Sequence, residues 1–363
     1  MAIALMRGLR DQFEFAVLAV RGVEDSHVGH DMRDELTALQ IPFFTGAKLP
    51  LKLGGMVFAG ARAAAVMRRF TPAAIHLHTE IPEATYAAMV TLQPTSGTIP
   101  LLRTIHNSVY WHFWPRLGRW CERRMRGAHV ACVSEGAKAA FEVHRAESSA
   151  GALPAPPVVI YNGVRSPDIP TSRRRVPTER LRVLFAGRFE PEKGTDLLPQ
   201  ILPLVQPPGT GGELVLHGSG AHRPVLEALA ARPPPGWILR VLPPVARLPE
   251  RMREFDLVIM PSRFEGLGLV AVEATLAGLP VVVTDAAGLR EAVPSNHPWR
   301  AKAGDPVDFA TCLQRAIDHA STWPAAVRQA QSFAQVRFAP ERMFVAYRQL
   351  YLRALGGASP FHR

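Results

Sequence analysis

Short apolar runs alternate with amphipathic segments along most of the chain. In the carboxyl-terminal half, apolar runs over residues 181–188, 213–217, 255–260 and 279–285 are typical of buried strands, and turn residues and helical patterns separate them. This alternation favours an α/β fold built on parallel sheets. A chain of 363 residues is long enough for two such domains, and an apolar content of 47% supplies two cores.

The amino-terminal half carries the same pattern. Residues 73–79 and 100–107 are predicted strands that end in polar residues, and residues 130–135 are predicted to be a strand followed by a helix that Ser134 caps. Residues 1–10 are predicted to be the end of a helix, and residues 11–20 to be a strand. His76 and His78 are two positions apart and should share one face of their strand.

One turn in the second half carries unusual chemistry. Glu265 lies in the glycine-containing segment 261–268, which joins a predicted strand to a predicted helix, and Glu273 lies in that helix, which Gly278 ends. In an open parallel sheet, ligands bind at the carboxyl ends of the strands, and a helix start offers free N–H groups and partial positive charge to a phosphate. Two carboxylates beside such a site indicate recognition of sugar hydroxyls. The alternative is a solvated Glu265 and a surface Glu273 on an amphipathic helix.

A second turn in the same half supplies positive charge. The predicted strand 181–188 ends in Gly187 and Arg188, and Lys193 follows in the loop that leads to the next predicted helix. Arginine grips phosphate oxygens with two N–H groups, and lysine adds a point charge. Together they can stabilise the negative charge that develops on a departing diphosphate. The alternative is that both are ordinary loop cations.

These two segments together resemble one known family. The sequence PSRFEGLGLVAVEATLAGLPVVVTD at 261–285 resembles the E-x7-E segment of family-4 retaining glycosyltransferases, and GRFEPEKG at 187–194 resembles the phosphate-binding pattern of the same family. The resemblance implies the GT-B architecture, an α/β fold in which two Rossmann-like domains face each other across a cleft. It also implies transfer of a sugar from a nucleotide-sugar donor without a bound metal or other cofactor.

The resemblance implies a role for each residue of these segments. Glu265 would contact the hydroxyls of the donor sugar, and Glu273 would hold the ribose hydroxyls. Arg188 and Lys193 would bind the diphosphate. The remaining donor-binding positions are backbone contacts in the two turns, namely Gly187, Gly266, Gly268 and Leu269.

Shorter matches extend the resemblance. Asn162 lies in VIYNGV, which is similar to the family's segment at the domain junction, and Gly218 lies in a G-x-G turn that the family uses near the nucleobase. His106 matches a histidine that approaches the donor sugar from the other domain. The alternatives are a plain strand-end turn at Asn162 and a strand-end histidine that neighbouring backbone satisfies. The predicted catalytic set is His106, Arg188, Lys193 and Glu265.

The resemblance also predicts the domain organisation. Residues 1–165 would form the acceptor-side domain, residues 166–339 the donor-side domain, and residues 340–363 a helix that crosses back to the first domain, with the linker at 171–177. Members of the family normally begin with a strand and a glycine-rich loop, and no such segment precedes residue 11. Three explanations stay open: an upstream start codon, a genuine truncation that impairs activity, or another segment that takes the strand's place.

A basic and aromatic segment suggests a surface for partners. Residues 111–126 combine tryptophans with five arginines and one glutamate, in a chain of net charge +11. Tryptophan suits a membrane–water interface, and basic residues bind anionic headgroups. We expect either peripheral contact with the inner membrane face, near a lipid-linked acceptor, or an amphipathic helix with buried tryptophans and a solvated basic face. No nucleic-acid motif accompanies the charge, so no nucleic-acid partner is predicted.

The remaining features narrow the function class. Cys121, Cys132 and Cys312 have neither metal-ligand spacing nor a disulfide framework, so the sequence predicts no metal site and a cytoplasmic location. The chain is predicted to be a retaining, metal-independent glycosyltransferase with a nucleotide-sugar donor and a glycan, lipid-linked or small-molecule acceptor. The alternatives are a sugar phosphorylase or nucleotide-sugar epimerase of the same architecture, and a catalytically impaired donor-binding or partner protein.

Overall fold

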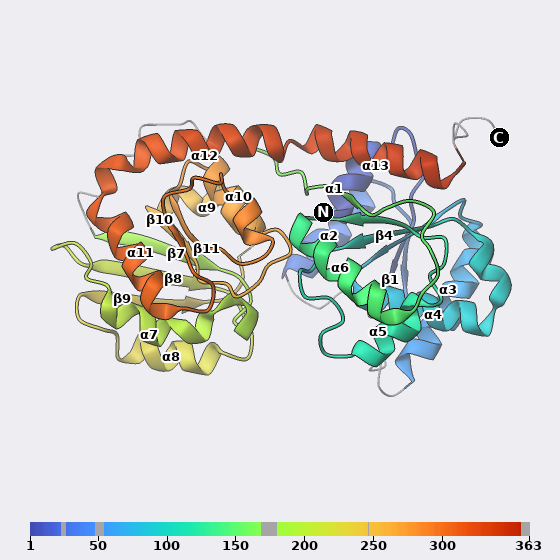
Figure 1. The fold of residues 1–363 in the computed structure, drawn as a ribbon, viewed down its shortest axis with the longest axis horizontal. Coiled ribbons are helices and arrows are strands. Elements are labelled where there is room, and N and C mark those ends of the chain that lie inside the picture. The colour runs from blue at the N-terminus through green and yellow to red at the C-terminus, as the bar shows by residue number, and fades with distance from the viewer. Residues whose placement is uncertain (23–26, 48–53, 168–179, 246, 357–363) are drawn as a thin grey trace. The chain divides into compact units, whose positions relative to one another are not determined.

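The computed structural model describes residues 1–22, 27–47, 54–167, 180–245 and 247–356. The chain forms two compact units: the first runs from Met1 to Gly163 and includes the segment that begins at Glu341, and the second runs from Val164 to Pro340. Both are α/β units with parallel sheets (Figure 1). The linker predicted at 171–177 lies outside the described residues.

The second unit contains a six-stranded parallel sheet. Its strands lie in the order β12-β11-β10-β7-β8-β9, so the first strand of the unit pairs with both the second and the fourth. This is the Rossmann order, and its topological switch point lies between β7 and β10. The strands are β7 (Leu181–Ala186), β8 (Gly212–His217), β9 (Trp237–Leu242), β10 (Leu257–Met260), β11 (Val281–Thr284) and β12 (Arg300–Ala301).

Helices cover both faces of this sheet. Apolar side chains of α7, α8 and α11 form one core cluster with alternate residues of β7, such as Val183 and Phe185, while α10 packs against α12 at the other face (Figure 1). Because both faces are covered, β10 and β11 are buried along their whole length, which explains their continuous apolar sequences. The helices are α7 (Leu198–Ile201), α8 (Arg223–Ala231), α9 (Leu248–Arg251), α10 (Leu269–Leu276), α11 (Pro306–Asp318) and α12 (Trp323–Arg337).

The described strands of the first unit form two parallel sheets. β1 (Val17–Ala19) pairs with β2 (Phe43–Thr45), and a separate sheet has the order β3-β4-β5-β6. The strands of the second sheet are β3 (Ile75–His78), β4 (Leu101–Ile105), β5 (His129–Cys132) and β6 (Val158–Val159). The helices are α1 (Ala2–Leu9), α2 (His27–Ala38), α3 (Gly55–Phe70), α4 (Glu80–Leu92), α5 (Pro115–Glu122), α6 (Glu135–Ser148) and α13 (Pro340–Ala354).

The last described helix belongs to the core of the first unit. Met343, Tyr347 and Leu350 of α13 are buried in one cluster with Leu5 and Leu102. Tyr347 also exchanges a hydrogen bond with Thr104 of β4, at 2.9 Å between the two hydroxyl oxygens. The chain therefore returns to its first unit after completing the second.

Two predicted elements differ from the structure. The strand expected over residues 11–20 is confined to Val17–Ala19, because the N–H groups of Gln12 and Phe13 still donate to Leu9 and keep the chain turning out of α1. The helix expected after Lys193 is replaced by the four-residue α7 between two 3-10 turns, Thr195–Leu197 and Leu202–Leu204, because Pro199 and Pro203 have no N–H to donate to a continuous α-helix. The predicted cap is confirmed: the Ser134 hydroxyl accepts from the N–H of Ala137 at 3.0 Å.

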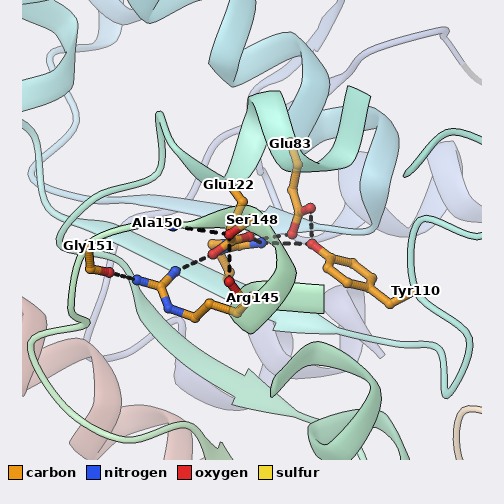
Figure 2. A network of polar contacts seen from close by, with 8 residues as sticks. Glu83, Tyr110, Glu122, Arg145, Ser148, Ala150 and Gly151 are labelled. Atoms are coloured by element: carbon orange, nitrogen blue, oxygen red, sulfur yellow. Dashed lines mark hydrogen bonds and ion pairs between the residues drawn. The ribbon is translucent and has the colours of Figure 1, made fainter. Parts of the chain in front are cut away.

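A buried ionic network ties three helices of the first unit to its sheet (Figure 2). Arg103 of β4 donates to Glu83 of α4 at 3.1 Å, to Glu122 of α5 at 3.0 and 2.8 Å, and to the Tyr110 hydroxyl at 2.7 Å. Arg145 of α6 also pairs with Glu122. Burial raises the pKa of Glu83. Burial acts in the same direction on Glu122, but the charges and hydrogen bonds of Arg103 and Arg145 together outweigh it, so the pKa of Glu122 is lowered. The network holds α5 and the loop before it in place.

Candidate functional site

The sheet order of the second unit brings two predicted motifs to one edge. The motif around Lys193 follows β7, the motif around Glu265 follows β10, and these two strands are neighbours with Leu257 opposite Val183. Both loops therefore leave the carboxyl edge of the sheet at its switch point, which is where doubly wound sheets bind ligands.

Lys193 and Glu265 form the centre of this site. The Lys193 ammonium donates to both carboxylate oxygens of Glu265, at 2.7 and 2.6 Å. The Ser262 hydroxyl donates to Glu265 Oε1 at 2.9 Å. The Glu265 side chain is 7% exposed and that of Lys193 20% exposed, so the pair is sheltered but still reachable. The interpretation of Glu265 as a solvated surface residue is therefore wrong.

A second ion pair connects the same two loops. Arg263 donates to both carboxylate oxygens of Asp196 at 2.7 Å, and its hydrogen bonds hold the pKa of Asp196 below the usual value. A Cβ atom at Gly194 would lie 2.0 Å from the carbonyl oxygen of Pro261, so only glycine allows this close approach. Arg263, Asp196 and Ser262 are not among the predicted site residues, and the one signal for them in the sequence is their position inside the two motifs.

The helix start predicted to meet a phosphate has the expected form. Gly268 is the N-cap of α10 with φ of +74°, and no side chain caps the helix. Leu269 begins the helix, and Glu273 lies one turn further on. Glu273 is half-buried, and burial raises the pKa of its carboxyl to about 7.

The other predicted donor-binding residues are placed differently. Arg188 is exposed and pairs with Glu192 of its own loop at 2.6 Å. Gly218 follows β8, and its N–H donates to the carbonyl of Leu242 at 3.0 Å. Asn162 is buried in the first unit, and its side-chain carbonyl oxygen has no hydrogen-bond partner among the described residues.

His106 belongs to a histidine cluster at the edge of the first unit's sheet. Its Nε2 lies 3.0 Å from Nδ1 of His78, and the rings of His76 and His78 are 4.1 Å apart, which confirms that these two share one strand face. His76 in turn contacts the hydroxyls of Tyr351 and Thr104 at 2.9 and 2.8 Å. Burial lowers the pKa of His76 to about 3 and that of His106 to about 4, so both rings are neutral at pH 7.

Two further findings concern metal-binding clusters and membrane-spanning helices. Within the described ranges, no cluster of three or more His, Cys, Asp or Glu side chains is arranged to hold a metal ion. Across the same residues, none of the helices combines the length and apolar character that crossing a bilayer requires.

Comparisons with known proteins point to one family. Residues 1–166 match the family described as Glycosyltransferase Family 4, and residues 180–319 match that described as Glycosyl transferases group 1. The D-inositol 3-phosphate glycosyltransferase of Streptomyces coelicolor is 36% identical over 181 residues, which are 45% of this chain and 39% of that protein. The enzyme of the same name from Jonesia denitrificans is 42% identical over 120 residues, 31% of this chain and 28% of that protein. The chain thus matches less than half the length of these relatives.

Solved structures share the fold of this chain. Anabaena HepE, solved with UDP and glucose, has a TM-score of 0.76 at 20% identity, with 97% of this chain and 95% of that chain covered. Sucrose-phosphate synthase from Thermosynechococcus elongatus has a TM-score of 0.74 at 15% identity, with 95% and 100% covered. At this level of identity the likeness shows the fold alone. Family matches in both halves and the Rossmann-type units together show that the chain belongs to the family-4 glycosyltransferases of the GT-B fold.

Proposed function

We propose that this protein is a retaining glycosyltransferase that transfers a sugar from a nucleotide-sugar donor bound to its second unit. The observation that carries the proposal is the contact of Lys193 with Glu265 at the sheet's switch point. An ammonium has three N–H donors, and two of them already go to Glu265. The third is left for an oxygen of the donor's diphosphate.

Glu265 is suited to bind the donor sugar. A carboxylate has about four acceptor positions, and Lys193 and Ser262 occupy three of them. The remaining lone pair can accept from a sugar hydroxyl. Because two fixed neighbours hold the carboxylate, that hydroxyl would be bound in one orientation.

The other donor contacts are proposed from the motifs in which the residues lie. The start of α10 would meet the diphosphate with its N–H groups, and Glu273 would accept from the ribose hydroxyls. Arg188 would leave Glu192, a contact worth at most about 1 kcal/mol at an exposed site, and bind a phosphate oxygen. Gly187, Gly218, Gly266 and Asn162 are proposed to shape the same site.

Retention would come from attack on the same face as the leaving group. The acceptor oxygen forms a bond to the anomeric carbon while the bond from that carbon to the diphosphate breaks, and the acceptor proton passes to the departing diphosphate oxygen. Lys193, Arg188 and the helix start would stabilise the charge on that oxygen. We propose that His106 approaches the donor sugar, and that no metal takes part.

The relatives suggest which donor and acceptor classes to test first. Structures of HepE hold UDP and UDP-glucose, which supports a UDP-sugar as the first donor to test. The curated relatives are named for D-inositol 3-phosphate, which makes an inositol phosphate an acceptor to test beside a glycan or a lipid-linked saccharide. We further propose peripheral contact with the cytoplasmic face of the inner membrane through the exposed arginines Arg116, Arg123 and Arg126.

A donor screen tests the proposal. We expect UDP-, GDP- or ADP-sugars to raise the melting temperature, and product analysis by NMR to show the anomeric configuration of the donor. Turnover should persist in EDTA. A product of inverted configuration would exclude the mechanism, and the absence of any stabilising nucleotide sugar would exclude the donor site. Equal binding to neutral and anionic vesicles would exclude the membrane contact.

A further inference from the structure

The first unit contains an apolar cavity that the proposed donor chemistry does not use. Its volume is about 550 Å³, within the range of about 300–1,000 Å³ that is typical of ligand sites. The cavity lies among α3, α4, α5 and the loop before α5, and its apolar lining includes Met56, Ile81, Ala84, Trp111, Pro115 and Leu117.

One wall of this cavity is polar and adjoins the histidine cluster. Glu80 lines the cavity and accepts a hydrogen bond from Asn107 at 3.2 Å. Asn107 directly follows His106, the residue proposed to approach the donor sugar. A molecule that fills the cavity would therefore bring its polar end close to His106.

Trp111 is held in the cavity wall at a conformational cost. Its φ is +55°, which is unusual for a bulky residue, and its side chain is 4% exposed. The ring packs so closely on Gly118 of α5 that a Cβ there would lie 2.4 Å from Trp111 Cγ. The indole Nε1 is buried without a hydrogen-bond partner among the described residues. Sparsely populated backbone conformations of this kind cluster at ligand-binding sites.

The rim of the cavity matches a membrane surface. Phe113 is 85% exposed and Trp114 is 41% exposed, and both line the opening together with Arg116. Glu122, the acidic residue of this segment, is turned inward and neutralised by Arg103 and Arg145. The outer face is therefore aromatic and positively charged, as expected of a surface that meets anionic headgroups.

We propose that this cavity binds the hydrocarbon chain of a lipid-linked acceptor, whose hydroxyl-bearing head lies at the Glu80 and Asn107 end. This inference rests on the proposed glycosyltransferase function and names the acceptor class. The chain would pass from the bilayer between Phe113 and Trp114 into the cavity. A fully water-soluble acceptor would have no use for an apolar cavity with such a rim.

The test uses alkyl glucosides of four to ten carbons, each below its micelle concentration, and measures affinity for the full chain by calorimetry. We expect about fourfold tighter binding per added methylene until the cavity is full, followed by a plateau. Ala84→Phe should bring the plateau to shorter chains, because it fills part of the cavity. Affinity that does not depend on chain length, or an unchanged plateau in Ala84→Phe, overturns the proposal.

A second variant keeps the proposal testable if Ala84→Phe does not fold. Phe113→Ser changes an exposed side chain and should weaken octyl glucoside binding roughly tenfold, whereas Val143→Ser, which changes an exposed apolar residue of α6, should have no effect. A dimer that Phe113→Ser dissociates would assign the surface to a second copy and overturn the proposal. All three variants should keep the thermal shift with a nucleotide sugar; a wild type without that shift contradicts the proposed function instead.

Discussion

Lys193 is the residue on which the proposed chemistry depends most. Glu265 fixes its ammonium with two hydrogen bonds, so the remaining N–H is oriented before any donor arrives. A preorganised charge contact of this kind is worth about two to three orders of magnitude in turnover. The ion pair of Arg223 and Glu227 serves as a control, because both of its side chains are exposed to solvent and lie outside the proposed site.

We therefore expect Lys193→Ala to lower kcat about a hundredfold, while Arg223→Ala leaves it unchanged. Steady-state kinetics with the nucleotide sugar found by the donor screen will measure both. Circular dichroism of each variant controls for folding. An unchanged kcat in Lys193→Ala would remove the role assigned to this residue.

Glu273 leads to a prediction about pH. Burial raises the pKa of its carboxyl to about 7, and only the ionised form is a full acceptor for ribose hydroxyls. Donor binding should therefore weaken as the pH falls from 8 to 6, by up to about tenfold per unit below the pKa, and should release a proton near pH 7.

Calorimetry in buffers of different ionisation enthalpy measures this linkage. A nucleotide sugar is the appropriate ligand, since its diphosphate is esterified at both ends and keeps its charge over this range. Glu273→Gln should show no such pH dependence. A wild type whose affinity is equally flat would contradict the prediction.

Single helices owe their positions to buried polar contacts. Arg103 joins α4, α5 and α6 to β4 through Glu83, Glu122 and their partners (Figure 2). Removing one partner of a buried ion pair leaves the others uncompensated and costs about 3–5 kcal/mol. The pair of Arg240 and Glu213, in which the arginine side chain is 62% exposed, should contribute at most about 1 kcal/mol.

Arg103→Met should consequently lower the free energy of unfolding of the first unit by about 3–5 kcal/mol, and Arg240→Ala should change that of the second by at most about 1 kcal/mol. Urea denaturation followed by tryptophan fluorescence and circular dichroism measures both. Equal losses in the two variants would show that the network contributes no more than a surface pair.

The N-cap of α6 should contribute less to the stability of the first unit than the Arg103 network does. The Ser134 hydroxyl satisfies the N–H of Ala137 in a fully buried position. Ser134→Ala should destabilise the first unit by about 1 kcal/mol, whereas Ser134→Thr should retain most of the stability. Urea unfolding of the two variants compares them directly, and a Thr variant as unstable as the Ala variant would count against capping.

The whole molecule depends on a helix far from the start of the chain. Met343, Tyr347, Leu350 and Tyr351 of α13 are buried in the first unit. At about 1.5–3 kcal/mol each, their burial contributes as an upper estimate about 6–12 kcal/mol, which is comparable to the roughly 5–15 kcal/mol that stabilises a whole domain.

Deletion of residues 340–363 should therefore unfold the first unit and leave the second folded. Calorimetry should then show one unfolding transition, and limited proteolysis should leave a fragment of the second unit. Deletion of residues 357–363 alone serves as the control. A truncated chain that keeps both transitions would show that α13 is dispensable.

Much of the second unit could be predicted from sequence. The apolar runs of β7, β8, β10 and β11 and the turns after them carry local signals, because strand length, glycine and helix starts depend on neighbouring residues. The same local signals overestimated β1 and the helix after Lys193, where the continuation of α1 and the prolines at 199 and 203 decided the backbone.

The residue types in the two motifs of the second unit, and so the kind of chemistry these motifs can perform, are readable from the chain alone. The fold was needed to show that Lys193 binds Glu265, 72 residues away, and that Arg263 binds Asp196. It was also needed to show that Trp111 and Glu80 line one cavity. Such contacts follow from strand order and helix packing, which depend on the summed burial of the whole chain and leave no local trace in the residues that meet.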